Sequence, residues 1–518
     1  MSDLRLGIDV GGTNVDAVIM DADDRLLAKT KQLTTADVTG GIDAALQAVL
    51  QAPGIDRARI THVMLGTTHA TNAVIERRNL NRVAVVRIGA PSTTAIRPLF
   101  TWPDDLRRAV SAGETIIGGG IEFDGREIVP LDVDGLRRFL APLAGTIDGV
   151  ALTSVFASVS ERHELEAEQI VHEELGEDVH VSLSHEIGSL GILERENATV
   201  LNSALVAVAA EVSSALDSAL RSQGLDAATF FAQNDGTLMA IDYALRYPVL
   251  TIGSGPANSI RGAAFLSGAQ EALVADVGGT STDVGVLVNG FPRESSAAVE
   301  IGGIRTNFRM PDLVAIAVGG GSVLTGSDGA VTVGPRSVAH GLTERALVFG
   351  GDVPTLTDAA VADGRAAIGT RAPPDGLRSL LAAGLRRAEQ SFAEAVDMIK
   401  TARGDRPLIV VGGGGVLVPE RVPGVSELIR PEHHDVANAV GAAIASVSAQ
   451  VDRVFQFGAG GRAAAVDEAT RLAREQAVRA GARADEVEIV EVEELPLAYL
   501  NVPAVRMRVK AAGPLSSV

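Results

Sequence analysis

Short apolar runs alternate with amphipathic segments through the first part of the chain, which is the pattern of buried strands followed by helices. Strands are predicted at residues 4–10, 17–20, 26–30, 60–65, 82–88 and 149–153. Helices are predicted at residues 40–51, 70–79, 134–143 and 161–174. This alternation indicates an α/β fold.

The pattern changes twice further along the chain. A long Ala/Val-rich helix is predicted at residues 193–220, and a small-residue helix at 436–448 should pack closely against a neighbour. The region between them carries a helix at 380–401 and a strand at 408–411. Beyond residue 450, a strand, a helix and two strands predict a small α+β appendage. We therefore divide the chain into residues 1–192, 193–450 and 451–518.

Two segments of the chain are near-copies of each other. Each has a buried strand ending near an aspartate, a Gly-Gly turn, a hydroxyl residue and a second aspartate that opens another apolar run. The first copy contributes Asp9, Gly11, Gly12, Thr13, Asn14 and Asp16, and the second contributes Asp276, Gly278, Gly279, Thr280, Ser281 and Asp283. The separation of the copies is far too long for a solenoid repeat, so it indicates a duplicated domain. Two half-sites should then face one ligand.

Each copy predicts a hairpin whose tip can cradle a phosphate, because glycine lets backbone N–H groups approach a ligand without a Cβ in the way. Neither copy has the Walker lysine or the helix of a Rossmann turn. A carboxylate beside a phosphate is repulsive unless a cation intervenes, so Asp9 and Asp276 predict a Mg²⁺ site. Asp16 or Asp283 could orient the acceptor or a metal-bound water. The alternative is a pair of ordinary Gly-Gly hairpins.

Two further glycine-rich turns are candidate ligand sites. Gly412, Gly413, Gly414 and Gly415 follow a predicted strand and could lie flat against a planar ligand, or could form a simple strand-to-helix corner. Gly319, Gly320 and Gly321 could offer backbone amides to an oxyanion or a phosphoryl group, or could join two strands.

A strand-turn-helix at residues 66–77 is a candidate substrate site. Thr67 or Thr68 could cap the helix, and Asn72 lies in its first turn, where the helix dipole favours an anion. His69 could handle a proton, although a lone histidine is more often a packed or solvated residue. The pair His433 and His434 could bind a divalent ion, but capping of the next helix by Asp435 is the favoured interpretation.

The paired loops resemble those of the actin, hexokinase and chaperone-ATPase superfamily. More narrowly, the chain resembles the hydantoinase A/oxoprolinase family through GTTHATNAVIER at 66–77, SGPA at 254–257, DVGGTSTDV at 276–284, AVGGGS at 317–322 and PTLTD at 354–358. The resemblance implies two related actin-like, ribonuclease H-like lobes around a nucleotide cleft, with the helix at 193–220 connecting them. It also implies that residues 412–415 form the adenosine loop and that residues 319–321 lie toward the cleft.

Membership of that family would imply an ATP-dependent subunit that opens a small cyclic amide, such as a hydantoin or 5-oxoproline, by phosphorylating its amide oxygen. His69 departs from the family pattern, which has an apolar residue or Thr there, and Leu65 stands where His is common. The alternatives are an ATP-hydrolysing subunit of an acetone-carboxylase-like enzyme and a nucleotide-dependent conformational module without chemistry. A hydantoinase B-like or other second subunit, and an oligomer, are expected.

Composition limits the remaining classes. The 518-residue chain carries a net charge of −20, which argues against nucleic acid as a partner. It contains no cysteine, which excludes disulfides, thiolate zinc sites and a cysteine nucleophile. No apolar signal core and no apolar run of membrane-spanning length are visible, so we expect a cytoplasmic enzyme that does not bind membranes.

Overall fold

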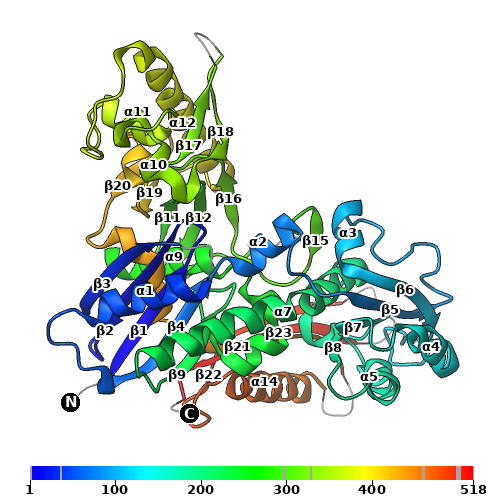
Figure 1. Ribbon diagram of the computed structural model, residues 1–518. Coiled ribbons are helices and arrows are strands. Elements are labelled where there is room, and N and C mark those ends of the chain that lie inside the picture. Colours follow the sequence, from blue (N-terminus) through cyan, green and yellow to red (C-terminus); the bar gives the residue numbers. More distant parts are fainter. Residues whose placement is uncertain are drawn as a thin grey trace.

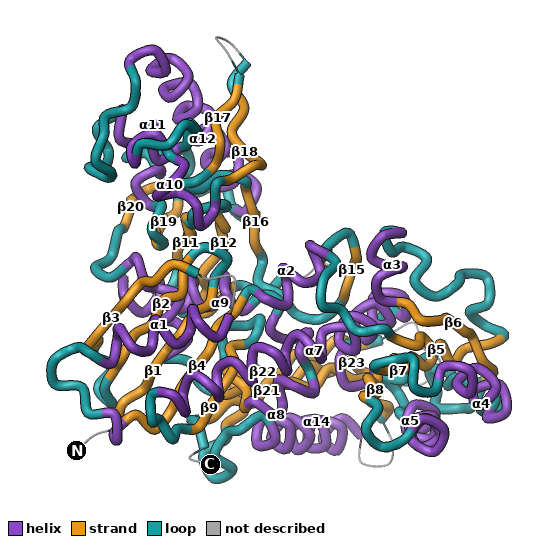
Figure 2. Tube along the Cα trace, viewed as in Figure 1, coloured by secondary structure: helices purple, strands orange, loops and turns teal. Residues whose placement is uncertain are grey.

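The computed structural model describes residues 3–34, 38–188, 190–295, 299–326, 330–457, 461–497 and 503–516. These residues form three larger β-sheets and two two-stranded hairpins, with covering helices. Figure 1 shows an upright lobe that rises from a broad base, with a further region at the side of that base. Figure 2 shows the Cα trace in the same view, coloured by secondary structure, with orange strands in the base and in the upright lobe.

The base is built on a nine-stranded sheet in the order β22-β23-β21-β10-β9-β4-β1-β2-β3. The bounds are β1 Leu4–Val10, β2 Asn14–Met20, β3 Leu26–Leu33, β4 Ile60–Thr67, β9 Ala228–Ala232, β10 Leu238–Ala240, β21 Val447–Gln456, β22 Glu488–Pro496 and β23 Ala504–Gly513. The helices α1 Val38–Leu50, α7 Ile192–Ser222, α8 Ile241–Arg246 and α14 Gly461–Arg479 pack with this sheet and with one another. Their apolar faces form one continuous core with it.

The upright lobe contains a sheet in the order β13-β12-β11-β19-β20, with β16 paired to β12. The bounds are β11 Ala272–Val277, β12 Thr282–Val288, β13 Phe291–Pro292, β16 Leu313–Ile316, β19 Arg406–Val411 and β20 Val425–Ile429. The hairpin β17 Ser322–Thr325 and β18 Thr332–Ser337 lies beside α10 Leu342–Arg345, α11 Leu356–Ala362 and α12 Arg378–Ile399.

The side region carries a four-stranded sheet in the order β6-β5-β7-β8. Its strands are β5 Val83–Ala90, β6 Ser111–Gly118, β7 Gly149–Ser154 and β8 His180–Leu183. Its helices are α2 His69–Glu76, α3 Asp104–Val110, α4 Val133–Leu140, α5 Arg162–Leu175 and α6 Ser184–Ile187. A small hairpin of β14 Val299–Ile301 and β15 Ile304–Thr306 packs against α7.

The duplicated motif forms two hairpins of identical register. Asp9 pairs with Asp16 across β1 and β2, and Asp276 pairs with Asp283 across β11 and β12. In both lobes the first strand also pairs in parallel with a later strand, β4 in one case and β19 in the other. The α/β expectation is therefore confirmed, and the sequence repeat corresponds to a structural repeat.

The nine-stranded sheet contains strands from all three of the segments into which the sequence analysis divided the chain. Strands β9 and β10, from the middle segment, and β21 to β23, from the last segment, all pair within the nine-stranded sheet of the base. The helix predicted at 436–448 is shorter: α13 spans Ala437–Ala443, and β21 begins at Val447. Val447, Ala449 and Val451 are buried in the core of the nine-stranded sheet at the two-residue spacing of a strand. The three predicted segments remain a proposal about folding units.

Helix α7 is long and apolar enough to cross a membrane by length and composition alone. In the described chain 61% of its most apolar window is buried, as expected of a core helix. Its residues contribute to two of the apolar cores, one under the nine-stranded sheet and one beside the four-stranded sheet.

Candidate nucleotide and phosphoryl-transfer site

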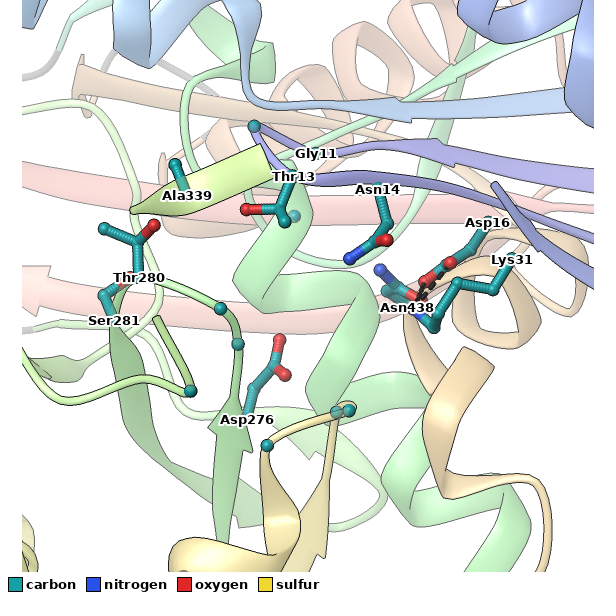
Figure 3. A pocket seen from close by; sticks show the side chains of 18 of the residues that line it. Gly11, Thr13, Asn14, Asp16, Lys31, Asp276, Thr280, Ser281, Ala339 and Asn438 are labelled. Atoms are coloured by element: carbon teal, nitrogen blue, oxygen red, sulfur yellow. Dashed lines mark hydrogen bonds and ion pairs between the residues drawn. The ribbon is translucent and has the colours of Figure 1, made fainter. Parts of the chain in front are cut away.

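The two hairpin tips approach each other at one large cavity. In each tip the first glycine N–H donates to the carbonyl three residues on, Gly11 to Asn14 and Gly278 to Ser281, both at 2.9 Å. The tips lie close together, since a Cβ on Gly279 would stand 3.2 Å from the Thr13 hydroxyl. Figure 3 shows Thr13 and Asn14 on one side of the cavity and Thr280 and Ser281 on the other.

The cavity has a volume of about 690 Å³ and is lined by all twelve residues that the repeat singled out. Its walls come from both lobes, and helices α9 Ser254–Ser267 and α13 contribute Ser259 and Asn438. The sequence prediction that two half-sites face one space is thus met in the geometry, while the roles of the individual residues stay predictions.

Four carboxylates meet at this cavity. Burial, with the charges of Asp16 and Asp276, raises the pKa of Asp9 to about 7. Burial, with the charge of Asp276, likewise raises the pKa of Asp283 to about 7. The pKa values of Asp16 and Asp276 are also raised, again chiefly by burial. Crowded carboxylates resist ionisation together, so the site favours a bound cation.

The residues present fit a divalent cation. The Oδ1 atom of Asp9 is buried and has no hydrogen-bond partner among the described residues, so it can accept a ligand. Mg²⁺ takes one or two carboxylates and keeps waters and phosphate oxygens as its other ligands. No group of three or more Asp, Glu or His side chains in the described segments has the arrangement of a preformed metal site. These carboxylate donors therefore fit a Mg²⁺ ion that binds together with a triphosphate, whose oxygens supply further ligands.

Three neighbours of the carboxylates were not singled out by the sequence. Asn438 donates its Nδ2 to Asp9 Oδ2 at 2.7 Å, and Ser259 donates its hydroxyl to Asp276 Oδ2 at 2.6 Å. Lys31 places Nζ 2.6 Å from both carboxylate oxygens of Asp16. Figure 3 shows Lys31 and Asn438 converging on the Asp16 side of the cavity. Lys31 is the one positive side chain among the lining residues of this cavity.

The four-glycine turn contributes unequally to the cavity. Gly412, Gly413 and Gly414 line it, whereas Gly415 is buried behind the turn at the start of a 3-10 segment. Gly412 has φ +84°, and a Cβ there would stand 2.5 Å from Asp276 Oδ1. A Cβ on Gly413 would meet no protein atom within 4 Å and would project into open space. Gly413 is therefore the position where a ligand could lie flat against the backbone.

The turn of Gly319, Gly320 and Gly321 acts mainly as a support for the second hairpin. Gly320 N–H donates to Gly278 O at 3.1 Å, and Gly321 N–H donates to Gly279 O at 2.7 Å. Gly320 lines the cavity, but Gly319 and Gly321 do not. Gly319 N–H donates to the Ser322 hydroxyl at 2.9 Å, so all three amides bond within the protein. The structure gives an anchoring contact where the sequence suggested amides free for a ligand.

Residues of the strand-turn-helix segment at 66–77 line two separate cavities. Thr68 and Asn72 line the nucleotide cavity, and Glu76 joins them from the same helix. Thr67 and His69 instead border a separate small space beside α7. His69 Nδ1 lies 2.7 Å from the Thr67 hydroxyl, and burial lowers the pKa of His69. His69 therefore does not face the four carboxylates, and a catalytic role for it gains no support from its position.

The histidine pair before α13 has no metal-like arrangement. His433 adopts a left-handed conformation with φ 62°, and His434 opens a short 3-10 turn. Asp435 makes an ion pair with Lys29 at 2.7 Å, and no capping bond from a side chain is found at that turn or at α13. The expectation that Asp435 caps the helix is wrong, because Lys29 of β3 takes its carboxylate.

Comparison with known proteins identifies the class that this fold and site define. The hydantoinase/oxoprolinase N-terminal region matches residues 5–175, and the hydantoinase/oxoprolinase region matches residues 195–369. The chain belongs to the hydantoinase/oxoprolinase family. The expected pair of α/β lobes with matching hairpins around one cavity is confirmed.

Particular relatives were found within that family. The chain is 27% identical to caprolactamase subunit alpha of Pseudomonas jessenii over 76% of this chain and 58% of that one. It is 26% identical to the acetophenone carboxylase gamma subunit of Aromatoleum aromaticum over 69% of this chain and 52% of that one. A crystal structure of the ATP-dependent caprolactamase of P. jessenii superposes with a TM-score of 0.77 at 21% identity, over 99% of this chain and 88% of that one. The chain thus spans little more than half the length of these curated relatives.

Proposed function

We propose that this chain is the ATP-hydrolysing subunit of an enzyme that opens a small cyclic amide. The observation that carries the proposal is the one cavity that both hairpin tips and four aspartates line, two of them buried and two half-buried. Neither hairpin alone can surround a triphosphate, whereas the two together offer backbone amides, hydroxyls and carboxylates on opposite sides. This arrangement supports the proposal that Mg·ATP binds here.

The relatives favour an amide over other acceptors. Caprolactamase, by its name, acts on a lactam, and its P. jessenii form is ATP-dependent. An amide is stabilised by resonance, so hydrolysis needs an activated oxygen. In the proposed reaction the amide oxygen forms a bond to the γ-phosphorus while the bond from that phosphorus to the ADP oxygen breaks. Water then adds to the amide carbon, and the ring C–N bond breaks as the nitrogen takes up a proton, which leaves an acyl phosphate. A second water attacks the carbon of the acyl phosphate, and inorganic phosphate leaves with the former amide oxygen.

The chain's own residues have distinct tasks in this scheme. Asp9 and Asp276 would hold Mg²⁺, which supplies charge neutralisation for the transferred phosphoryl group. Asn438 and Ser259 orient those carboxylates through the hydrogen bonds described above. Asp283, which faces Asp276 and whose pKa is raised, would orient the acceptor. Thr68 and Asn72 would contact the amide from the side of the cavity formed by α2.

A second candidate is an ATP-hydrolysing subunit of a carboxylase. The similarity to the acetophenone carboxylase gamma subunit favours it, because the same phosphate site could phosphorylate bicarbonate or an enol. Both names describe a subunit, so we also propose that this chain works with a second chain, in an oligomer, in the cytoplasm.

An isotope experiment tests the leading proposal. The full complex, purified with whatever subunit accompanies this chain, is supplied with Mg·ATP and with caprolactam or 5-oxoproline labelled with ¹⁸O in the amide carbonyl. Transfer of ¹⁸O into inorganic phosphate is the expected result. Stimulation of ADP release only by a ketone with bicarbonate would replace the amide proposal with the carboxylase one. Nucleotide binding without stimulated turnover would indicate a conformational module.

A variant links the chemistry to the site. Asp276→Asn should abolish Mg²⁺-dependent ADP release while the fold and the thermal unfolding remain close to wild type, because it removes the negative charge and keeps the shape. Asp352→Asn, at an exposed position, is the matched control and should keep wild-type turnover. Unchanged ADP release in Asp276→Asn would remove this carboxylate from the reaction.

A further inference from the structure

A second cavity lies away from the nucleotide site. It has a volume of about 120 Å³ and lies between the end of α6, the loop after β9, the loop after β15 and strand β21. None of its lining residues also lines the nucleotide cavity. Three cationic side chains border it, His185, Arg309 and Arg453. A molecule bound here would therefore not contact the hairpins.

His185 is held in one orientation by a buried carboxylate. Glu164 of α5 accepts hydrogen bonds from Ser154 N–H at 2.8 Å, from the Ser184 hydroxyl at 2.5 Å and from His185 N–H at 3.0 Å. It also lies 2.7 Å from His185 Nδ1. Because an ionised carboxylate can only accept, Nδ1 carries the proton.

The charge state of this pair agrees with the geometry. Burial alone would lower the pKa of His185, but the hydrogen bond and charge of Glu164 outweigh it and raise that pKa. Burial alone would raise the pKa of Glu164, but the hydrogen bond and charge of His185 help to outweigh burial and lower that pKa. The imidazole is thus held toward its charged form, with Nε2–H available to a partner on the cavity side.

A carboxylate oxygen from the chain itself already lies between two of the cations. Glu161 Oε2 is 2.7 Å from Arg453 Nη1 and 3.8 Å from His185 Nε2. Glu161 immediately precedes α5, makes no capping hydrogen bond with its side chain, and its side chain is 39% exposed, so it can rotate into solvent at small cost. Its carboxylate occupies the position that the carboxylate of a ligand would take.

A hydrogen-bond acceptor completes the set. Asn307 lines the same cavity, and its Oδ1 is buried without a hydrogen-bond partner among the described residues. Its Nδ2 donates to Leu190 O at 3.0 Å, which fixes the amide with the oxygen as the free group. A buried acceptor without a partner costs free energy unless a ligand or a water supplies a donor.

We propose that this second cavity binds a small carboxylate that also carries an N–H donor, with Arg453 and His185 receiving the carboxylate in place of Glu161 and Asn307 receiving the N–H. Amino acids and lactam carboxylic acids have this chemistry. The site is separate from the nucleotide cavity, so the binding itself does not depend on the proposed reaction; only the test that separates the two sources of ligand rests on it. The ligand could reach it as an effector or as a substrate-derived molecule.

Calorimetry with three small probes tests the chemistry. 5-Oxoproline carries both groups, propionate carries only the carboxylate, and 2-pyrrolidinone carries only the lactam N–H. The full complex is titrated with each probe while a non-hydrolysable Mg·ATP analogue fills the nucleotide cavity. 5-Oxoproline should bind at least tenfold more tightly than either of the other probes. Equal binding of all three, or no binding of 5-oxoproline at millimolar concentration, would overturn the proposal.

Variants with effects of opposite sign locate the site. Arg453→Met and His185→Gln should each weaken 5-oxoproline binding by roughly 10-fold or more, as expected for loss of a hydrogen bond to a charged group. Glu161→Gln should tighten it several-fold, because it removes the competing carboxylate. Misfolding cannot produce that gain. Glu166→Gln, exposed on the same helix, is the matched control and should change nothing.

The same variants separate the two sources of ligand. If the ligand is an effector, 5-oxoproline should change caprolactam turnover in wild type and not in Arg453→Met. If it is substrate-derived, Arg453→Met should raise the KM for 5-oxoproline and leave caprolactam turnover intact. Wild-type 5-oxoproline affinity in Arg453→Met, His185→Gln and Glu161→Gln alike would place the binding elsewhere and refute the assignment.

Discussion

Asn438 donates a hydrogen bond from its side-chain amide to Asp9 Oδ2 at 2.7 Å, joining α13 to the first hairpin. The bond favours the ionised carboxylate, against the burial that raises the pKa of Asp9 to about 7. It also leaves Oδ1, which is buried without a partner among the described residues, as the oxygen available to a cation. The amide thus selects which oxygen of Asp9 can act as a ligand.

Removal of this amide should move the pH dependence of turnover. Asp9 must be ionised to hold Mg²⁺, so ATP hydrolysis should rise with pH through about 7. Asn438→Ala withdraws a donor to the ionised form, so the rise should shift to higher pH and kcat/KM at neutral pH should fall roughly 10- to 100-fold. Steady-state kinetics between pH 6 and pH 9 measure both effects. An unshifted profile would show that Asn438 does not tune Asp9.

The glycine turn gives a prediction with a built-in control. Gly413→Val should fold normally, because a Cβ there meets no protein atom within 4 Å, and should weaken nucleotide binding by filling the cavity. Gly412→Val should destabilise the protein, since φ is +84° and the Cβ would stand 2.5 Å from Asp276 Oδ1. Thermal unfolding and nucleotide titration compare the two. Wild-type nucleotide affinity in a folded Gly413→Val protein would mean that the turn only connects a strand to the next helical segment and does not contact the nucleotide.

Asp283 should make the protein less stable as pH rises. Its pKa is raised to about 7 in the folded state from an ordinary value of 3.8, so the folded protein binds the proton more tightly than the unfolded chain does. The resulting stabilisation is fully present below about pH 4 and is lost as pH rises through about 7. Between pH 5 and pH 8, the free energy of unfolding of wild type should fall by roughly 1–3 kcal/mol relative to that of Asp283→Asn.

Denaturant unfolding of both proteins at several pH values, without nucleotide, provides the measurement. The difference between the two free energies of unfolding isolates Asp283 from other titrating groups. Saturating Mg·ATP should remove the dependence, because a cation favours the charged carboxylate. A constant difference across this pH range would mean that Asp283 titrates as in the unfolded chain.

Sequence patterns were most informative where structure is decided locally. The runs around Asp9 and Asp276 predicted both hairpins, since a buried strand and a Gly-Gly turn are short-range features. Lys31, Ser259 and Asn438 were missed because each is a single polar residue in an ordinary strand or helix. Their approach to the carboxylates depends on how distant elements pack.

Strand pairing was the other feature that local patterns did not reveal. Strands β21 to β23 could be predicted from their local sequence, and β23 shows the alternating burial of a half-exposed strand, but their partners could not. Their place beside β10 is set by contacts such as Lys510 to Asp235 at 2.6 Å, which join residues far apart in the chain. A single sequence carries no local signal for such a contact.

The remaining prediction is that Mg·ATP closes the two lobes about the contact between α9 and α13. Two helical segments predicted from the sequence are candidates for the hinge, residues 194–202 within the connecting helix and residues 436–448. In the structure the first of these segments packs beside the four-stranded sheet, where Glu196 binds Arg87 at 2.7 Å. Helix α13 lies on β1, β2 and β4, while α9 also contacts β11, β12 and β19 of the upright lobe. The pair therefore lies at the junction between the lobes.

Small residues make this junction unusually close. A Cβ on Gly262 would stand 1.8 Å from Ala437 O, and one on Gly441 would stand 1.9 Å from Asn258 O. Backbones in such contact can slide without side chains interlocking. ATP would favour the arrangement in which both hairpins reach it, because only that state offers ATP all of its contacts.

Hydrogen exchange with and without Mg·ATP should show added protection at Gly11–Gly12 and at Gly278–Gly279 together, with α14 unchanged as an internal reference. X-ray scattering should show compaction. Protection at one hairpin alone, without compaction, would mean that the two lobes do not close on a shared ligand.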